Sequence, residues 1–356
     1  MDAKKALFIC GTPFHIITSV FLKNQYNMKS DMIIYDEFPQ TDILKKNLCE
    51  YAGFDNVEIM SHEKDFGMPR NKTLIYLFSF LGYFRIKKYV PSVLPQITDY
   101  SDVFFANAQS VDVVDRFIYC YLKKYHPSIK LHYMEEGWEC YDEKYYNLTK
   151  LDYIFRKYIV GGNTHFFGMT IHSYSLDLYD SINPNKKMEV LQIEKNNQSV
   201  TEILKKVFSY IQIEDLSSYD SIVFDTVRKE EFVNDGSEKF NAVVNEVLKN
   251  KDNNSVIVKP HPRDKNKHFD YKYFKTYGFP FEILCLYCDF NNYTFINNFS
   301  SAVFTPKLLF DQEPTIVFSY KLLEENMNHV EGDKSLIIEN FRNLYRDSSK
   351  IVVLEK

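Results

Sequence analysis

Short apolar runs alternate along this chain with longer stretches in which apolar residues recur at helical spacing. This alternation is typical of an α/β protein whose strands run parallel and are joined by crossover helices. The first series predicts strands over 6–11, 30–36, 56–60, 101–107 and 129–137, and helices over 13–25, 41–53, 70–90 and 110–126, the third ending before Pro91. We expect it to form one doubly wound, Rossmann-like sheet.

A second α/β series begins near residue 219, after a less regular stretch rich in Tyr, Asn, Lys and Ser. It predicts strands over 219–226, 254–263, 281–286 and 314–320, a helix over 237–250, and a helix and a strand at the carboxyl end. We therefore predict an amino-terminal domain over 1–155, a linker with irregular elements over 156–215, and a carboxyl-terminal domain over 216–356. The last helix is expected to pack back on the first domain.

The composition agrees with two globular domains and excludes some functions. A chain of 356 residues with 45% hydrophobic and 26% charged residues can bury two ordinary cores. Its net charge of −5 argues against a general nucleic-acid-binding protein. The basic cluster Arg85, Lys87 and Lys88 is a candidate contact for an anionic membrane, although a solvated helix end is the simpler interpretation.

The sequence gives no sign of export, so we expect a cytoplasmic protein. The apolar start resembles a signal peptide, but CGTPFH at 10–15 interrupts it and no small-residue cleavage site follows. No run approaches the roughly 18 apolar residues of a membrane span. The six cysteines lie in apolar surroundings, as reduced thiols do. Cys285 and Cys288 form a lone C-x-x-C, which we interpret as core packing.

Polar residues follow several predicted strands, at the place where ligands of open α/β sheets bind. The strand over 129–137 ends in Glu135, Glu136 and Gly137, and the only tryptophan, Trp138, comes next. One interpretation is a solvated turn in which Gly137 takes a positive φ. The other is a catalytic carboxylate beside a sugar that stacks on Trp138.

A second cluster follows the strand at 254–263. Lys259, His261 and Arg263 alternate with Pro260 and Pro262, which stop the hydrogen-bond ladder and fix the loop. A cationic, protonatable loop at a strand end suits a phosphate group. A rigid loop with an incidental histidine is the alternative.

Three further features could contact a ligand. Ser300 and Ser301 fall where a helix would begin, so they either cap it or bind an anion there. Glu282 could hydrogen-bond a ribose diol, and Gly11 and Thr12 could offer an amide and a hydroxyl between a strand and a helix. The chain has no D-x-D triplet to hold a divalent cation against a diphosphate, which favours a donor that needs no metal.

In chain order, EEG at 135–137, KPHP at 259–262, PFE at 280–282 and the serine pair at 300–301 resemble the motifs of bacterial sialyltransferases. Their order and the opening FICGTPFHI at 8–16 are most similar to glycosyltransferase family 52. The related capsular polysialyltransferase family shares the acidic pair with glycine, the H-P motif and the serine pair.

The resemblance implies a GT-B fold, in which two Rossmann-like domains face each other across a cleft. The acceptor would bind mainly to the first domain and CMP-sialic acid mainly to the second. The implied reaction is an inverting, metal-independent transfer of sialic acid to a galactose-type hydroxyl of a bacterial surface glycan, either lipo-oligosaccharide or capsule. The resemblance therefore implies no cofactor, and CMP-sialic acid is the donor substrate.

The resemblance also assigns roles to residues. Glu136 would be the general base, with Glu135 as the alternative, because glutamate stands here where many relatives have aspartate. His261 would contact and protonate the leaving phosphate. The implied donor contacts are Ser300 and Ser301 to phosphate, Glu282 to ribose, and Lys259 and Pro260 around the cytosine. Pro262, Gly11 and Thr12 are further expected donor contacts. The implied acceptor contacts are Gly137 and Trp138.

Two other functions remain open. One is a glycosyltransferase that moves glucose or galactose from a UDP-sugar, and the other is a non-catalytic module that binds a nucleotide or glycan. The expected partners are the donor, an oligosaccharide or glycolipid acceptor and the inner face of the cytoplasmic membrane. The apolar helix over 70–90 would equally serve a homodimer, which relatives in the family form.

Overall fold

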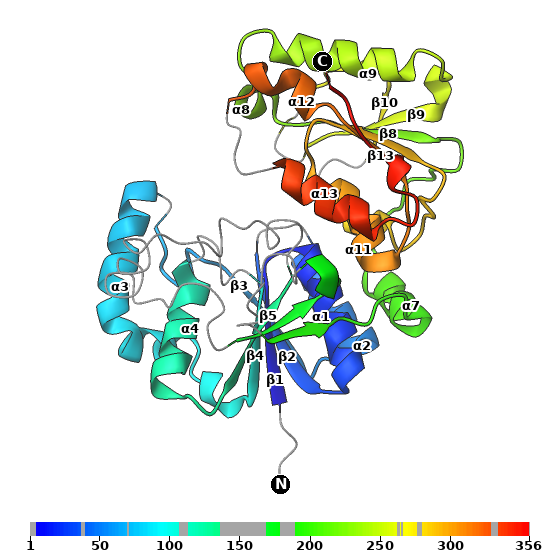
Figure 1. The fold of residues 1–356 in the computed structure, drawn as a ribbon. Coiled ribbons are helices and arrows are strands. Elements are labelled where there is room, and N and C mark those ends of the chain that lie inside the picture. The colour runs from blue at the N-terminus through cyan, green and yellow to red at the C-terminus, as the bar shows by residue number, and fades with distance from the viewer. Residues whose placement is uncertain are drawn as a thin grey trace. The chain divides into compact units, whose positions relative to one another are not determined.

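The computed structural model describes residues 5–36, 40–69, 71–106, 113–135, 169–178, 189–261, 264, 266–275, 280–328 and 334–355. The chain divides into two compact units, Met1–Tyr210 and Ile211–Lys356. Each unit is built on its own sheet (Figure 1).

The first unit contains a parallel sheet in the order β3-β2-β1-β4-β5-β6-β7. Its strands are β1 (Lys5–Cys10), β2 (Lys29–Tyr35), β3 (Asn56–Met60), β4 (Asp102–Phe105), β5 (Lys130–Met134), β6 (Thr170–Ser173) and β7 (Glu189–Gln192). Its helices are α1 (Pro13–Tyr26), α2 (Thr41–Tyr51), α3 (Lys72–Val93), the 3₁₀ turn η1 (Ile97–Asp99), α4 (Val113–Tyr125) and α7 (Gln198–Val207). The order reverses between β1 and β4, as in a Rossmann sheet.

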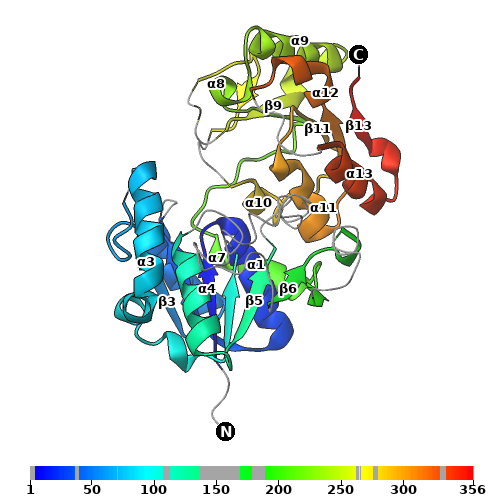
Figure 2. The same cartoon turned by 60° about the vertical axis from the view of Figure 1, so that its left-hand side comes forward.

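Helices cover both faces of this first sheet, which explains its apolar strands. In Figures 1 and 2, α3 and α4 lie side by side on one face, while α1 and α2 lie on the other. On β1 and β4, Phe8 and Phe104 stack with ring centroids 4.4 Å apart. The helix α1 starts at Pro13, whose missing N–H costs nothing in a first turn, and ends before Asn27 in the left-handed region.

The second unit repeats this topology in the order β10-β9-β8-β11-β12-β13, again with parallel strands. The strands are β8 (Ser221–Phe224), β9 (Val256–Lys259), β10 (Lys272–Tyr273), β11 (Thr294–Asn297), β12 (Thr315–Phe318) and β13 (Ile351–Val353). The α-helices are α8 (Arg228–Glu231), α9 (Gly236–Leu248), α10 (Phe281–Leu284), α11 (Thr305–Phe310), α12 (Tyr320–Leu323) and α13 (Lys334–Leu344). The 3₁₀ turns are η4 (Asn253–Ser255), η5 (Ser301–Phe304), η6 (Glu324–Asn326) and η7 (Ser348–Lys350). Here the order reverses between β8 and β11.

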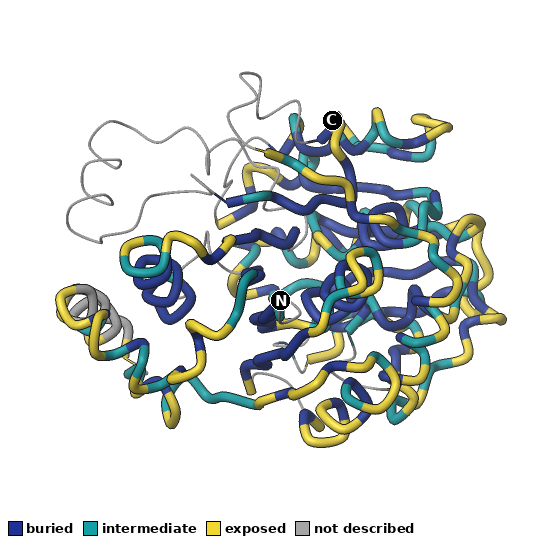
Figure 3. The backbone as a smooth tube through the Cα atoms, turned by 90° about the horizontal axis from the view of Figure 1, so that it is seen from below, coloured by how far each residue is buried: buried dark blue, intermediate teal, exposed yellow. Residues whose placement is uncertain are grey.

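Buried strands form the centre of each unit, as the dark blue tube in Figure 3 shows. In the second unit, the rings of Phe224 on β8, Phe281 on α10 and Phe295 on β11 contact one another. This cluster fixes α10 beside the ends of β8 and β11, where the sheet reverses.

The α/β class and most elements agree with the sequence prediction, but some segments differ. The segment 281–286 was predicted as a strand, which is wrong: it starts with the helix α10. The helix α3 continues past Pro91 to Val93. A proline in the last turn removes only one backbone donor, so the helix did not have to stop there.

Most of the described part of the predicted linker belongs to the first unit, which extends to Tyr210, and it contains regular elements. The strands β6 and β7 extend the first sheet in parallel, and the amphipathic α7 contacts α1 and α2. In the second unit, Phe341 on α13 stacks on Phe304 with centroids 3.9 Å apart. The sequence had led us to expect this last helix on the first domain, whereas this packing lies within the second.

Candidate functional site

The carboxyl edge of the second sheet gathers most of the predicted donor residues. Lys259 ends β9, and His261 lies two residues further on. Ser300 and Ser301 follow β11. Because β8 alone separates β9 from β11, these two loops start about 10 Å apart at the spacing of neighbouring strands.

Lys259 and Glu282 lie close enough to act on one another electrostatically. Both side chains are half-buried. Burial lowers the pKa of the Lys259 ammonium and raises the pKa of the Glu282 carboxyl, and the charge of each opposes the shift of the other. The sequence did not predict this electrostatic interaction, because the two residues were assigned separate roles.

The backbone around His261 is tied to its neighbours. The N–H of Asp225 donates to the carbonyl of Lys259 at 2.9 Å, and the N–H of Asp264 donates to the carbonyl of His261 at 3.0 Å. Pro260 is buried and the side chain of His261 is half-buried. Pro262 and Arg263 lie outside the described residues.

The serine pair is held by a buried asparagine. The side chain of Asn297 accepts the N–H of Ser300 at 2.9 Å and donates to the carbonyl of Val317 at 3.1 Å. Ser300 precedes η5, but its hydroxyl makes no capping hydrogen bond, and Ser301 is exposed. The Ser300 hydroxyl therefore does not cap this turn, although capping was one of the two interpretations from the sequence.

Sequence reasoning missed a row of polar side chains at this edge. The side chain of Asn298 donates to Glu231 at 2.6 Å and accepts the Ser319 hydroxyl at 3.2 Å. Thr226 donates to the other oxygen of Glu231 at 3.3 Å. These residues follow β8, β11 and β12, so polar residues directly after buried strands were the signal that could have revealed them.

In the first unit, Glu135 is a buried carboxylate just after β5. Its side chain is 0% exposed, and Oε2 accepts the Ser173 hydroxyl at 2.9 Å and the N–H of Tyr174 at 2.7 Å. The carboxylate therefore joins the ends of β5 and β6. Glu136, Gly137 and Trp138 lie outside the described residues.

The loop after β1 uses its polar groups within the first unit. The N–H of Gly11 donates to Nδ1 of His15 at 3.1 Å. The Thr12 hydroxyl accepts the N–H of His15 at 3.3 Å and caps α1. These are the amide and the hydroxyl that were expected, from the sequence, to contact the donor substrate.

Cys285 packs in the core, as the sequence predicted. It is a free, buried thiol that donates to the carbonyl of Phe281, and Cys288 is also free. Over the described ranges, no group of three or more His, Cys, Asp and Glu side chains is placed to hold a metal ion. Nor is any helix there long and apolar enough to cross a membrane.

No protein-family model and no curated protein sequence matches the chain. Among solved structures, it is similar to LpCGTa in complex with UDP, with a TM-score of 0.53 at 9% identity, over 99% of this chain and 86% of the other. A UDP-GlcNAc 2-epimerase of Methanocaldococcus jannaschii, in complex with UDP-GlcNAc and UDP, gives 0.48 at 13% identity over 99% and 89%. An α,α-trehalose-phosphate synthase (UDP-forming) of Burkholderia vietnamiensis gives 0.39 at 7% over 89% and 84%.

The likeness to LpCGTa, together with the two Rossmann-like sheets, confirms the predicted GT-B fold. At 9% identity it shows the fold alone.

Proposed function

We propose that the chain is an inverting sialyltransferase that moves sialic acid from CMP-sialic acid to a galactose-type hydroxyl of a bacterial surface glycan, lipo-oligosaccharide or capsule. The carboxyl edge of the second sheet is the observation that carries this proposal. There Lys259 ends β9, His261 follows it, and the serine pair follows β11, with β8 between the two strands. An ammonium, an imidazole and two hydroxyls suit the single phosphate of a CMP leaving group.

In the proposed reaction, the acceptor hydroxyl oxygen bonds to C2 of the sialic acid as the bond from C2 to the phosphate oxygen of CMP breaks. Glu136 takes the hydroxyl proton, and His261 gives a proton to the departing phosphate. The transition state resembles an oxocarbenium ion, so charge placed on both sides of C2 lowers its energy.

The burial of Glu135 supports Glu136 as the base. A general base must come within hydrogen-bonding reach of the acceptor hydroxyl. Glu135 is enclosed in the first unit, and one of its oxygens already accepts two hydrogen bonds. We therefore propose that Glu135 anchors the strand end and that Glu136 performs the chemistry.

We propose further that the reaction needs no metal ion and that the protein works in the cytoplasm. The proposed acceptor is a glycolipid or oligosaccharide met at the inner face of the membrane. Arg85, Lys87 and Lys88, on the exposed side of α3, would be attracted to its anionic lipids. A homodimer through α3 is the alternative use of this helix.

A transferase that uses a UDP-sugar is the second candidate. It is favoured by the likeness to LpCGTa, which was solved in complex with UDP. Its donor carries a diphosphate, and a metal ion would then often stimulate transfer. A non-catalytic module, the third possibility from the sequence, would bind CMP without transferring or hydrolysing a donor.

One assay separates these functions. The protein is incubated with CMP-sialic acid or with UDP-sugars and a lactose-type acceptor, with and without EDTA. We expect EDTA-resistant release of CMP and a sialylated product. Transfer from a UDP-sugar alone, or CMP binding without turnover, would overturn the proposal.

The Glu136→Gln variant tests the base in the same assay. It should bind CMP normally and transfer about 10²–10⁴-fold more slowly. Full activity of this variant would remove Glu136 from the base role.

A further inference from the structure

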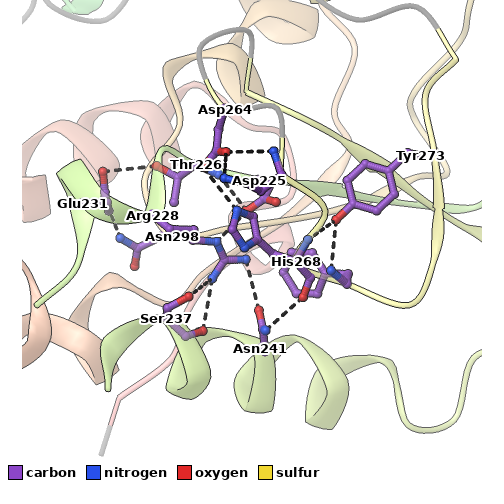
Figure 4. A network of polar contacts seen from close by, with 12 residues as sticks. Asp225, Thr226, Arg228, Glu231, Ser237, Asn241, Asp264, His268, Tyr273 and Asn298 are labelled. Carbon is purple, nitrogen blue, oxygen red and sulfur yellow. Dashed lines mark hydrogen bonds and ion pairs between the residues drawn. The ribbon is translucent and has the colours of Figure 1, made fainter. Parts of the chain in front are cut away.

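Arg228 is a buried cation at the start of α8, directly after β8, and its guanidinium bonds to two other elements (Figure 4). It is 5% exposed, and Nε donates to Asp225 at 2.8 Å. Its terminal nitrogens donate to the Ser237 carbonyl and to the Asn241 side chain, each at 3.1 Å. Ser237 and Asn241 both lie on α9.

Two contacts lead from Arg228 to the residues after His261, which we call the His261 loop: His261, Asp264 and 266–269. Asn241, held by the guanidinium, donates to the carbonyl of His268 at 3.0 Å. The guanidinium lies 4.9 Å from the ring centroid of Phe269. Within the loop, Nε2 of His268 lies 3.2 Å from the carboxylate of Asp264.

Asp264 carries this restraint to His261. Its own N–H donates to the carbonyl of His261 at 3.0 Å. Burial alone would raise the pKa of Asp264, but hydrogen bonds from Asn266 and His268 outweigh it and lower the pKa. The charged carboxylate therefore fits its surroundings. It links His268, whose carbonyl Asn241 holds, to the residue that bonds the His261 carbonyl.

We propose that Arg228 is a positioning residue that orders the His261 loop and so holds His261 at the leaving phosphate. The role of His261 in this inference rests on the proposed function. A well-packed apolar pair in place of Arg228 and Asp225 would stabilise the fold as well. This is because removing two charges from water costs free energy that offsets much of the attraction between them. Only the planar five-donor fork of arginine can bond several elements at once.

The test compares Arg228→Lys with Lys307→Met, a matched control. Lys307 is likewise 5% exposed and paired with Glu313 at 2.6 Å in the same unit. Among the described residues it also contacts Asp311 and the ring of Tyr345, which belong neither to the partners of Arg228 nor to the His261 loop. The first measurement is backbone amide exchange. Arg228→Lys should speed exchange of the amides of Asp264 and 266–269 at least about tenfold, because lysine keeps the charge but loses the fork. Lys307→Met should leave these amides unchanged.

The second measurement is a double-mutant cycle on kcat with CMP-sialic acid, which general destabilisation would not reproduce. If Arg228 acts through His261, Arg228→Lys should lower kcat about tenfold in the wild type and less than about twofold in the His261→Asn background.

Each outcome decides something different. Unchanged amide exchange in Arg228→Lys overturns the ordering role. Faster exchange with equal effects on kcat in both backgrounds overturns the action through His261. A wild-type protein that transfers nothing from CMP-sialic acid overturns the proposed function and with it the catalytic part of this inference, while the exchange measurement still decides whether Arg228 orders the loop.

Discussion

The carboxylate of Glu135 accepts the backbone N–H of Tyr174 at 2.7 Å, which joins the end of β5 to the residue that follows β6. The Ser173 hydroxyl, at 2.9 Å, donates to the same oxygen. A carboxylate that is 0% exposed depends on such charge-assisted hydrogen bonds, because burying it without them would cost several kcal/mol. Glu135, the first residue of the acidic pair after β5, therefore does not lie in a solvated turn.

This contact predicts how Glu135→Gln behaves. Glutamine keeps one acceptor oxygen but loses the charge, so the hydrogen bonds from Ser173 and Tyr174 weaken. We expect the free energy of unfolding to fall by about 1–3 kcal/mol, measured by urea denaturation. Sialyl transfer by the folded variant should fall far less than in Glu136→Gln.

Glu58→Gln on β3, where the side chain is exposed, is the control and should change neither quantity. If Glu135→Gln kept full stability and lost transfer, Glu135 rather than Glu136 would be the base.

The ribose contact that the resemblance implies for Glu282 predicts selectivity for the ribose of the nucleotide. A carboxylate that accepts the ribose 2′-hydroxyl should make CMP bind about tenfold tighter than 2′-deoxy-CMP. In Glu282→Gln this preference should fall towards one, as measured by calorimetric titration of both nucleotides.

The exposed Glu246→Gln on α9 is the matched control and should keep the wild-type preference. An unchanged ratio in Glu282→Gln would show that this carboxylate does not contact the 2′-hydroxyl.

Sequence patterns predicted both sheets because a parallel strand covered on two faces is a run of apolar residues, as in SIVF of β8 or TIVF of β12. The same rule failed for 281–286. A short apolar run there fits a buried helix as well as a strand, and α10 buries Phe281 against two strands. The strand β7, with the sequence EVLQ, is largely exposed, so it had no apolar run to reveal it.

The candidate site was predictable where its residues end a strand or lie within a few residues of its carboxyl end. Lys259 and the serine pair were found in this way. The Asp225–Arg228 pair was missed, since in the sequence DTVRKEE it has the appearance of a charged surface stretch. Its burial depends on the rings of Phe240 and Phe269, which are distant in the chain and meet only in the fold.

The serine pair predicts a phosphate-specific effect on binding. The Ser301 side chain is exposed, and the Ser300 hydroxyl is not needed to cap η5. Ser301→Ala should therefore change the free energy of unfolding by less than about 0.5 kcal/mol. CMP should bind about three- to tenfold more weakly, because one hydrogen bond to a charged phosphate is lost.

Cytidine, which has no phosphate, is the control ligand and should bind Ser301→Ala as it binds the wild type. Equal weakening of cytidine and CMP would show that Ser301 acts elsewhere than on the phosphate.

Burial of His15 makes the stability of the first unit depend on pH. The side chain is 2% exposed, and burial lowers the pKa of His15 from 6.5 to about 3. Below pH 6.5, His15 binds a proton in the unfolded chain but not in the folded chain, so the free energy of unfolding falls as the pH decreases. The loss is about 1.4 kcal/mol for each pH unit from 6.5 down towards the folded pKa.

The variant His15→Asn should remove this dependence, because its side-chain oxygen can accept the N–H of Gly11 without titrating. Its absolute stability is expected to be lower, since a smaller side chain fills the same buried space. The decisive quantity is therefore the slope of unfolding free energy against pH, measured by urea denaturation between pH 7.5 and pH 5. Below pH 6.5 the slope of the variant should be smaller than the wild-type slope by about 1.4 kcal/mol per pH unit, which corresponds to one proton bound on unfolding. If the two stability curves were parallel, His15 would be protonated in the folded chain. The buried His172, whose pKa is also lowered to about 3, is present in both proteins and does not affect the difference.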